Sequence, residues 1–292
     1  MNRAESAFEG EYKFLDKITN TLSGFCFSFF LLYKNFTGNC CIVQRASDMT
    51  TITIGYVDGF IDYDSIITFC QGTEGRIITR FNQMPNWPSG HSGSISVTWA
   101  KAPVIYRSGT LQTDPSLSIA APLFENSRQC ELFDNYNLTN ITDAKAIFVS
   151  TARLLSYRNS SIMGLIYGAG GFDLSLLQTT SSNTISFYLR DTSQTPNLDA
   201  VSIGYNLNTT YLVSAYHSNE TRNLRLNGVK VAESSTQLNL SPRHDNFRQG
   251  RTRTLDNYYQ HGYLDTSIAV LGGSEKMQVS IEKVVNKKYQ IF

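Results

Sequence analysis

The 292-residue sequence has no apolar run long enough to cross a bilayer and no excess of one charge. Its one strongly apolar run, residues 22–32 (LSGFCFSFFLL), has about half of the ~20 residues that a transmembrane helix needs. We therefore expect this run to lie in a core and the chain to have no membrane span. Lys and Arg total 25 and Asp and Glu total 24, so the net charge is +1, and nucleic acid is not an expected ligand.

The chain also lacks the residue spacings of metal sites. Its cysteines are odd in number and show no CxxC spacing, and its four histidines show no HxxxH spacing. No metal or other cofactor is expected. The acidic and basic residues before the apolar run do not fit a signal peptide, so we expect a protein that is not exported and has free thiols. A disulfide between Cys40 and Cys41 is the alternative. The cysteines are Cys26, Cys40, Cys41, Cys70 and Cys130.

Long helical periodicity is almost absent, and short alternating runs take its place. The runs at residues 42–44, 51–56, 146–149, 162–167, 174–177, 185–189, 212–216 and 267–273 are separated by turn residues. Regularly spaced short strands of this kind predict an all-β sandwich. Two helices are predicted, near residues 62–71 and 275–288, the first with Asp62 as its N-cap.

The clearest local pattern is RNLRLNGVKVAE, residues 222–233. Its Asn-Gly pair lies between two alternating runs and predicts a type I′ hairpin, because both central residues must take positive φ. Pairing across this turn is expected to set Leu226 opposite Val229 and Leu224 opposite Val231, with all four on one buried face.

Several motifs together resemble a known family. Residues 33–38 read YKNFTG, residues 43–48 read VQRASD, and residues 81–83 read FNQ. This order resembles the start of the arabinofuranosidase B catalytic-type domain, and the Asn-Gly hairpin and terminal helix resemble concanavalin A-like (laminin G-like) domains of phage and viral structural proteins. The resemblance implies a jelly-roll sandwich of two antiparallel sheets over residues 21–292, with residues 1–20 as a polar docking segment.

Enzymes of the resembled family are retaining glycosidases, which use two carboxyl groups about 5 to 5.5 Å apart. Their nucleophile is a Glu in a strand similar to MGLIYG here, where Gly164 takes its place. Their acid/base is an Asp in a turn near LDN, residues 255–257, which leaves Asp256 as the one matching acid. We therefore expect a protein without enzymatic activity. The alternative is a divergent glycoside hydrolase that uses Asp256 and acts on arabinose-containing polysaccharide. For Asp256, the competing interpretation is an ordinary turn residue.

Three residues are candidates for glycan binding: Trp87, Asp256 and Asn257. Trp87 lies in a loop rich in Pro, Gly and Ser, where its ring could stack on a sugar or pack on the sandwich edge. The Arg-rich segment 243–253 is expected to be a solvated loop. The alternative is a docking surface for an acidic neighbour or an anionic sugar.

The expected role is a virion component, such as a head fibre, decoration or tail protein. The resemblance to viral domains and the expected absence of a signal peptide and a carboxylate pair favour it. Near-zero net charge also suits close packing beside other copies. The expected partners are other virion proteins, further copies of the chain (a trimer rather than a dimer, through residues 1–20) and a host-surface glycan. A cytoplasmic monomer of unrelated role is the competing interpretation.

Overall fold

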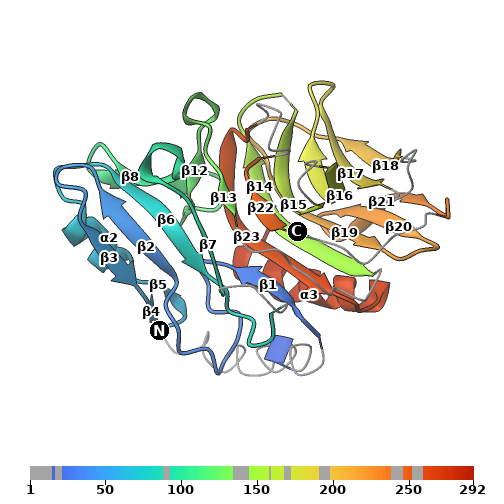
Figure 1. Cartoon of the computed structure of the whole chain (residues 1–292), viewed down its shortest axis with the longest axis horizontal. Coiled ribbons are helices and arrows are strands. Elements are labelled where there is room, and N and C mark those ends of the chain that lie inside the picture. The colour runs from blue at the N-terminus through green and yellow to red at the C-terminus, as the bar shows by residue number, and fades with distance from the viewer. Residues whose placement is uncertain are drawn as a thin grey trace.

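Antiparallel strands dominate the computed structural model of the chain (Figure 1). The structure describes residues 15–16, 22–87, 93–133, 145–157, 159–167, 172–190, 198–237, 246–251 and 259–292.

The strands of the N-terminal half are β1 (Gly24–Phe27), β2 (Cys41–Arg45), β3 (Thr51–Ile54), β4 (Tyr56–Val57), β5 (Phe60–Ile61), β6 (Gly75–Phe81), β7 (Ser94–Ser96), β8 (Val104–Arg107), β9 (Thr110–Leu111), β10 (Thr113–Asp114), β11 (Ile119–Ala120), β12 (Leu123–Phe124) and β13 (Leu132–Phe133). Those that follow are β14 (Ala146–Leu154), β15 (Ser160–Tyr167), β16 (Phe172–Thr179), β17 (Thr184–Arg190), β18 (Leu198–Gly204), β19 (Thr210–His217), β20 (Arg222–Leu226), β21 (Val229–Ser234), β22 (Asn246–Gln249) and β23 (Gly262–Leu271). The helices are α2 (Tyr63–Phe69) and α3 (Glu275–Tyr289), with 3-10 turns at Trp99–Lys101 and Asn126–Arg128.

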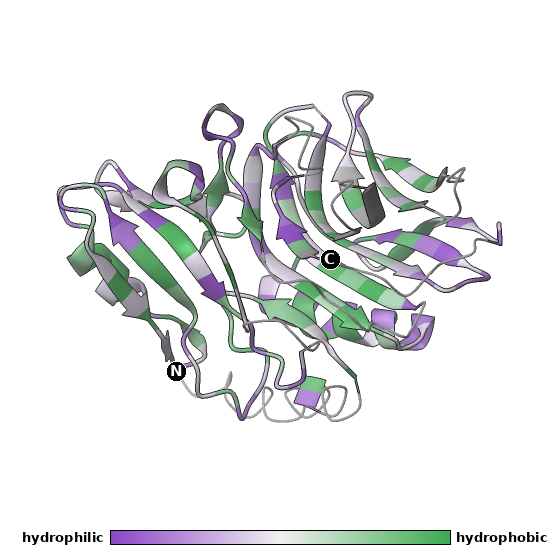
Figure 2. Cartoon of the chain, viewed as in Figure 1, coloured by the Kyte–Doolittle hydropathy of each residue, from purple (hydrophilic) through white to green (hydrophobic). Residues whose placement is uncertain are grey.

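Two antiparallel layers face each other and form a sandwich. One layer runs β1–β23–β14–β19–β20–β21, and the other runs β7–β13–β22–β15–β16–β17–β18. The first core fills the space between them. It contains Phe148 and Ala269 from one layer and Leu165, Phe187 and Phe247 from the other. The predicted all-β sandwich is thus confirmed, and Figure 2 shows hydrophobic residues along the strands of both layers. The jelly-roll connectivity stays a prediction.

The second core lies on the outer face of the β14–β19–β23 layer. Ile147, Leu212 and Ile268 point away from the first core and pack against Ile281 and Val285 of α3. Leu15 is also buried in this core, at 1% exposure. Because β14 and β23 are apolar on both faces, they can serve two cores at once. The apolar run at residues 22–32 lies in the cores as expected, since β1 is buried along its whole length.

The third core is formed by β2, β3, β6, β8 and α2, which gather at one end of the molecule (Figure 1). It contains Val43, Ile54 and Ile77 from the strands and Ile66 from α2. Both predicted helices are confirmed. The side chain of Asp62 accepts a hydrogen bond of 3.0 Å from the backbone N–H of Ser65 and so caps α2.

The predicted hairpin is present, but its register differs from the expected one. Its two turn residues have φ of 49° and 78°, as a type I′ turn requires, and Leu226 lies opposite Val229. Leu224, however, lies opposite Ala232 instead of Val231, because a bulge shifts the pairing by one residue. Val229 is 62% exposed, so the expectation of a fully buried apolar face is wrong.

All five cysteines are buried free thiols, and the alternative of a bond between Cys40 and Cys41 is not seen. Among the described helices, none is long and apolar enough to span a membrane.

Candidate functional site

One candidate site is a cavity of about 390 Å³ beside Trp87. Trp87 is 42% exposed, and among the described residues it is one of few large apolar side chains left open to solvent. Asp256 and Asn257, the other two candidates from the sequence, lie outside the described residues. The cavity is lined by Asp16, Tyr33, Asn35, Phe36, Thr37, Gly38, Gln83, Met84, Pro85 and Trp87.

The side chain of Gln83 fixes the floor of this cavity. Its Oε1 accepts a hydrogen bond from the backbone N–H of Leu32 at 2.8 Å, and its Nε2 donates to the carbonyl of Phe30 and the hydroxyl of Tyr56, both at 2.7 Å. Gln83 is 1% exposed, so these bonds satisfy a buried amide. The FNQ motif therefore holds the loops around the cavity in place.

Aromatic and polar groups share the cavity wall. The ring of Phe36 meets that of Tyr56 edge-on with centroids 6.2 Å apart, and the ring of Trp87 packs over Gly93. Burial raises the pKa of Asp16, while a backbone hydrogen bond from Lys34 and the charge of that lysine act in the opposite direction. Aromatic faces beside carboxylate and amide groups are the usual lining of a site for a polar organic ligand.

Gly164, the residue that the sequence resemblance aligns with the nucleophile of the family, lies in β15. It pairs with Arg248 of β22, which in turn pairs with Phe133 of β13, so these three residues share one face of the layer. The guanidinium of Arg248 lies 5.3 Å from the centre of the Phe133 ring. The described part of the chain therefore places a cation and an aromatic ring on the same face of the layer as Gly164.

A buried acid that the sequence did not single out lies close to this face. Glu131 is 2% exposed, and its carboxylate accepts hydrogen bonds from Arg251 at 3.0 Å and from Lys101 at 3.1 Å. The guanidinium of Arg248 lies 3.9 Å from the same carboxylate and forms an ion pair with it. The expectation that segment 243–253 is a solvated loop is wrong for its described part, because Arg248 and Arg251 are buried and neutralise this acid.

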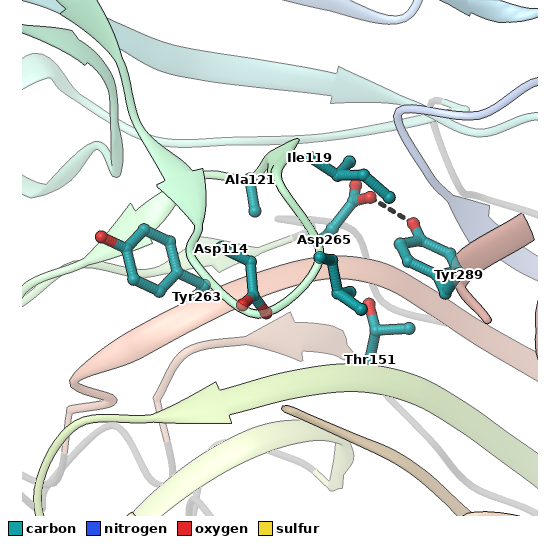
Figure 3. Close-up of a pocket in the computed structure, with 8 residues that line it drawn as sticks. Asp114, Ile119, Ala121, Thr151, Tyr263, Asp265 and Tyr289 are labelled. Atoms are coloured by element: carbon teal, nitrogen blue, oxygen red, sulfur yellow. Dashed lines mark hydrogen bonds between the residues drawn. The ribbon is translucent and has the colours of Figure 1, made fainter. Parts of the chain in front are cut away.

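Two further carboxyl groups, Asp114 and Asp265, line a smaller cavity of about 10 Å³ (Figure 3). This is room for about one water molecule. Figure 3 shows Asp265 directed at Tyr289 of α3, whose hydroxyl donates a hydrogen bond to it. Asp265 also accepts a backbone hydrogen bond from Phe29 at 3.1 Å and lies 3.6 Å from Arg80.

Burial raises the pKa of Asp265 to about 6, although Arg80 and the two hydrogen bonds act against this shift. A carboxyl group with such a pKa has the property of a general acid near neutral pH. The cavity around it is too small for a sugar, so this pair of acids does not form a substrate site. Sequence reasoning missed both residues, because neither lies in a recognisable motif.

Comparison with solved structures shows which fold this is. An arabinofuranosidase complexed with arabinofuranosyl-alpha-1,2-xylobiose matches with a TM-score of 0.64 and 14% identity over 94% of this chain and 65% of its own. A GH54 α-L-arabinofuranosidase soaked with a cyclic sulfate inhibitor matches with a TM-score of 0.63 and 13% identity, over 94% of this chain and 64% of its own. A mutant GH54 α-L-arabinofuranosidase soaked with 4-nitrophenyl α-L-arabinofuranoside matches with a TM-score of 0.61 and 14% identity, over 94% of this chain and 64% of its own.

The chain thus spans slightly less than two thirds of the length of these enzymes. No protein-family model matches the sequence. No curated protein matches it either. At such low identity the similarity establishes the β-sandwich fold of the arabinofuranosidases and nothing finer.

Our expectation of a protein without enzymatic activity is contradicted by these matches. The solved structures that align with 94% of the chain are glycoside hydrolases. That expectation depended on Gly164 in place of the expected nucleophile, and a divergent glycoside hydrolase was its alternative. One missing residue is not sufficient ground, because a divergent enzyme can recruit an acid from another element of the same fold.

Proposed function

We propose that the protein is a divergent glycoside hydrolase that acts on arabinose-containing polysaccharide. The observation that carries this proposal is the match of nearly the whole described fold to arabinofuranosidases. The cavity beside Trp87 supports it, because about 390 Å³ falls in the range of small-molecule sites.

The acid/base in this proposal is Asp256, assigned through the resemblance of residues 255–257. Asp265 has a suitable pKa but lies in a cavity that admits no sugar. Glu131 is held by its cationic partners and is 2% exposed, so it stabilises the fold instead of reaching substrate. The second carboxylate can be identified by mutating the remaining acidic residues one at a time. The turnover of each variant is compared with that of the Asp256 variant.

The test is incubation of the full chain with an aryl α-L-arabinofuranoside and with mixed arabinose-containing polysaccharides. We expect release of the aryl group and of reducing sugar, and loss of turnover by at least about a hundredfold in Asp256→Ala, the size typical of a general acid/base. Asp64→Ala, which removes an exposed acid from α2, is the matched control and should keep full activity. Folded wild-type protein that releases nothing from any of these substrates would contradict the proposal.

The virion role stays a prediction that depends on the resemblance to viral domains. It includes assembly as a trimer, contact with other virion proteins and attachment to a host glycan. The solution mass of the full chain and of a variant lacking residues 1–20 tests the trimer. If purified virions do not contain the protein, the predicted location in the virion is wrong.

A further inference from the structure

We propose that the cavity beside Trp87 binds a planar aromatic ring, such as that of a phenol or a hydroxycinnamate ester. The ring is either a free compound or a substituent carried by a polysaccharide. This inference goes beyond the proposed function, because the group that it names is not the sugar that a glycoside hydrolase cleaves.

Two aromatic side chains of the lining are held in place by the surrounding structure. One side of the Trp87 ring rests on Gly93, where an added Cβ atom would lie 3.4 Å from the ring, while 42% of Trp87 stays exposed. The ring of Phe36 meets that of Tyr56 edge-on, with centroids 6.2 Å apart. Aromatic rings attract a further ring in offset or edge-to-face geometry, beyond the gain from buried area. Trp87 therefore offers a fixed and accessible surface for stacking.

The rest of the apolar lining suits the same kind of ligand. A methionine thioether is polarisable and makes favourable contacts with aromatic rings. The cavity volume of about 390 Å³ falls in the range of small-molecule sites, so a ring with a short side chain can enter. Half of the ten lining residues are aromatic, Met or Pro: Tyr33, Phe36, Met84, Pro85 and Trp87.

The polar floor of the cavity has little left to offer a ligand. The Nε2 group of Gln83 has two protons to donate. It already faces three acceptors: the carbonyls of Ser28 and Phe30 at 3.1 and 2.7 Å and the hydroxyl of Tyr56 at 2.7 Å. Its Oε1 accepts a hydrogen bond from the backbone N–H of Leu32 at 2.8 Å. A sugar hydroxyl on this floor would lose its bonds to water and find few partners in return, which disfavours binding.

The remaining polar side chains of the lining are few. Asp16 accepts a hydrogen bond from the backbone N–H of Lys34 and interacts with the charge of that lysine, so it is not a free anion at the cavity. Asn35 and Thr37 are exposed, and their side chains can bond to a hydroxyl or ester group that a ring carries. This lining favours a flat ring with one or two polar substituents over a sugar with a hydroxyl group on most of its carbons.

NMR titration of the full chain with methyl ferulate tests the site. This ester has no net charge, so the charges of Asp16 and Lys34 contribute little to its binding. We expect saturable binding. The control ligand is the analogue in which a cyclohexane ring replaces the aromatic ring. It should bind at least about threefold more weakly, because it gains no attraction between aromatic rings. Equal binding of the two esters, or no saturable binding of methyl ferulate, would overturn the proposal.

Three variants test the assignment of the ring to this cavity. Trp87→Ala should weaken binding of methyl ferulate by about tenfold, because a stacked ring and its buried area are lost. Trp87→Phe keeps a ring at this position and should bind within about threefold of the wild type. Trp99→Phe is the matched control, since it keeps an aromatic ring beside the guanidinium of Arg76, which lies 4.4 Å from the Trp99 ring. It should bind as the wild type does. Wild-type affinity in Trp87→Ala would show that the cavity assignment is wrong.

An arabino-oligosaccharide that carries a feruloyl ester distinguishes the two sources of the ring. After mild alkali removes the ester, the oligosaccharide should bind at least about tenfold more weakly. Tighter binding of the esterified oligosaccharide than of methyl ferulate would identify a polysaccharide substituent as the source, and equal or weaker binding would identify a free compound. Both results support an aromatic ligand. Equal binding before and after alkali would mean that the cavity recognises the sugar, and the proposal would be wrong. Since methyl ferulate has no glycosidic bond, its binding can succeed or fail independently of the proposed hydrolysis.

Discussion

At the scale of single residues, Asp265 is a carboxyl group whose burial disfavours its charge and whose contacts partly offset this effect. It is 3% exposed, and burial disfavours its charged form. The hydrogen bonds from Tyr289 and from the Phe29 N–H, together with the charge of Arg80, favour the carboxylate but do not cancel the effect of burial. A group in this situation makes the stability of the fold depend on pH.

The direction of this dependence follows from the two pKa values. The pKa of Asp265 in the folded chain is about 6, which lies above the value of about 3.9 expected for an unfolded chain. Protonation therefore favours the folded state. The stabilising contribution is fully present below the unfolded value and is lost as the pH rises through about 6.

We predict that the free energy of unfolding of the wild type, relative to Asp265→Asn, falls by about 2 kcal/mol between about pH 4.5 and about pH 7.5. Groups common to both proteins cancel in this difference. Urea unfolding at three pH values across the interval measures it. Asp64→Asn, on the exposed side of α2, controls for loss of a surface carboxyl group. A difference that stays constant with pH would show that Asp265 does not titrate in this range.

The sequence identified only part of the candidate site. Trp87 could be selected because it lies in a loop rich in Pro, Gly and Ser, where aromatic residues often have a surface role. Asp16 and Phe36 could not, since their proximity to Trp87 depends on how segments distant in sequence pack together. Glu131 was missed for the same reason, because its partners come from segments about 30 and 120 residues away.

At the scale of secondary-structure elements, β23 is the strand that most of the fold depends on. It pairs with β1, β12 and β14 and contributes residues to the first and second cores. Its first residue, Gly262, pairs with Leu154 of β14 and Phe124 of β12. A Cβ atom at Gly262 would lie 2.2 Å from the carbonyl oxygen of Arg153, which is backbone and cannot rotate away.

We predict that Gly262→Ala lowers the free energy of unfolding by about 3 kcal/mol or more, because the pairing of β23 with β14 must shift to relieve this overlap. Gly55→Ala is a matched control, since a Cβ atom there meets no atom within 4 Å. It should leave stability nearly unchanged. Chemical denaturation of both variants measures the effect, and equal stability of the two would mean that β14 and β23 can separate locally at no cost.

Elements were predictable from the sequence where local chemistry decides them. The Asn-Gly turn and the Asp62 cap depend on neighbouring residues, and both formed as expected. The bulge beside Leu224 was not predictable, because alternation alone cannot show where a strand gains a residue. Arg248 of β22 and the nearby Arg251 were expected to be solvated, since charge usually indicates exposure, and their buried partner Glu131 lies far away in the sequence.

At the scale of the whole molecule, buried polar contacts connect the third core to the second core and to β23 of the sandwich. Arg80 of β6 lies 5.0 Å from the centre of the Phe29 ring in the third core and 3.6 Å from Asp265 of β23. Gln83 bonds to the backbone of Leu32 in the second core and to Tyr56, which packs on the third. Opening the third core alone would leave these buried polar groups without partners, at about 1 to 3 kcal/mol for each group.

The five buried thiols report on this coupling, because each core contains at least one of them. The first core holds Cys130, the second holds Cys26, and the third holds Cys40, Cys41 and Cys70. Burial raises the pKa of Cys70 to about 11 and that of Cys130 to about 12, so these two are protonated in the native state. Since the thiolate is the reactive form, labelling of a native core requires that it opens.

We predict that pulse labelling with a thiol reagent across a urea titration converts unmodified chain directly into chain with five adducts. The polar contacts between the cores should make unfolding a single cooperative transition, in which all five thiols become accessible together. Mass spectrometry counts the adducts on each molecule, and peptide mapping assigns them. A population with exactly the three adducts of Cys40, Cys41 and Cys70, formed at lower urea than the rest, would contradict this prediction. It would mean that the third core opens independently and that the contacts of Arg80 and Gln83 do not couple it to the sandwich.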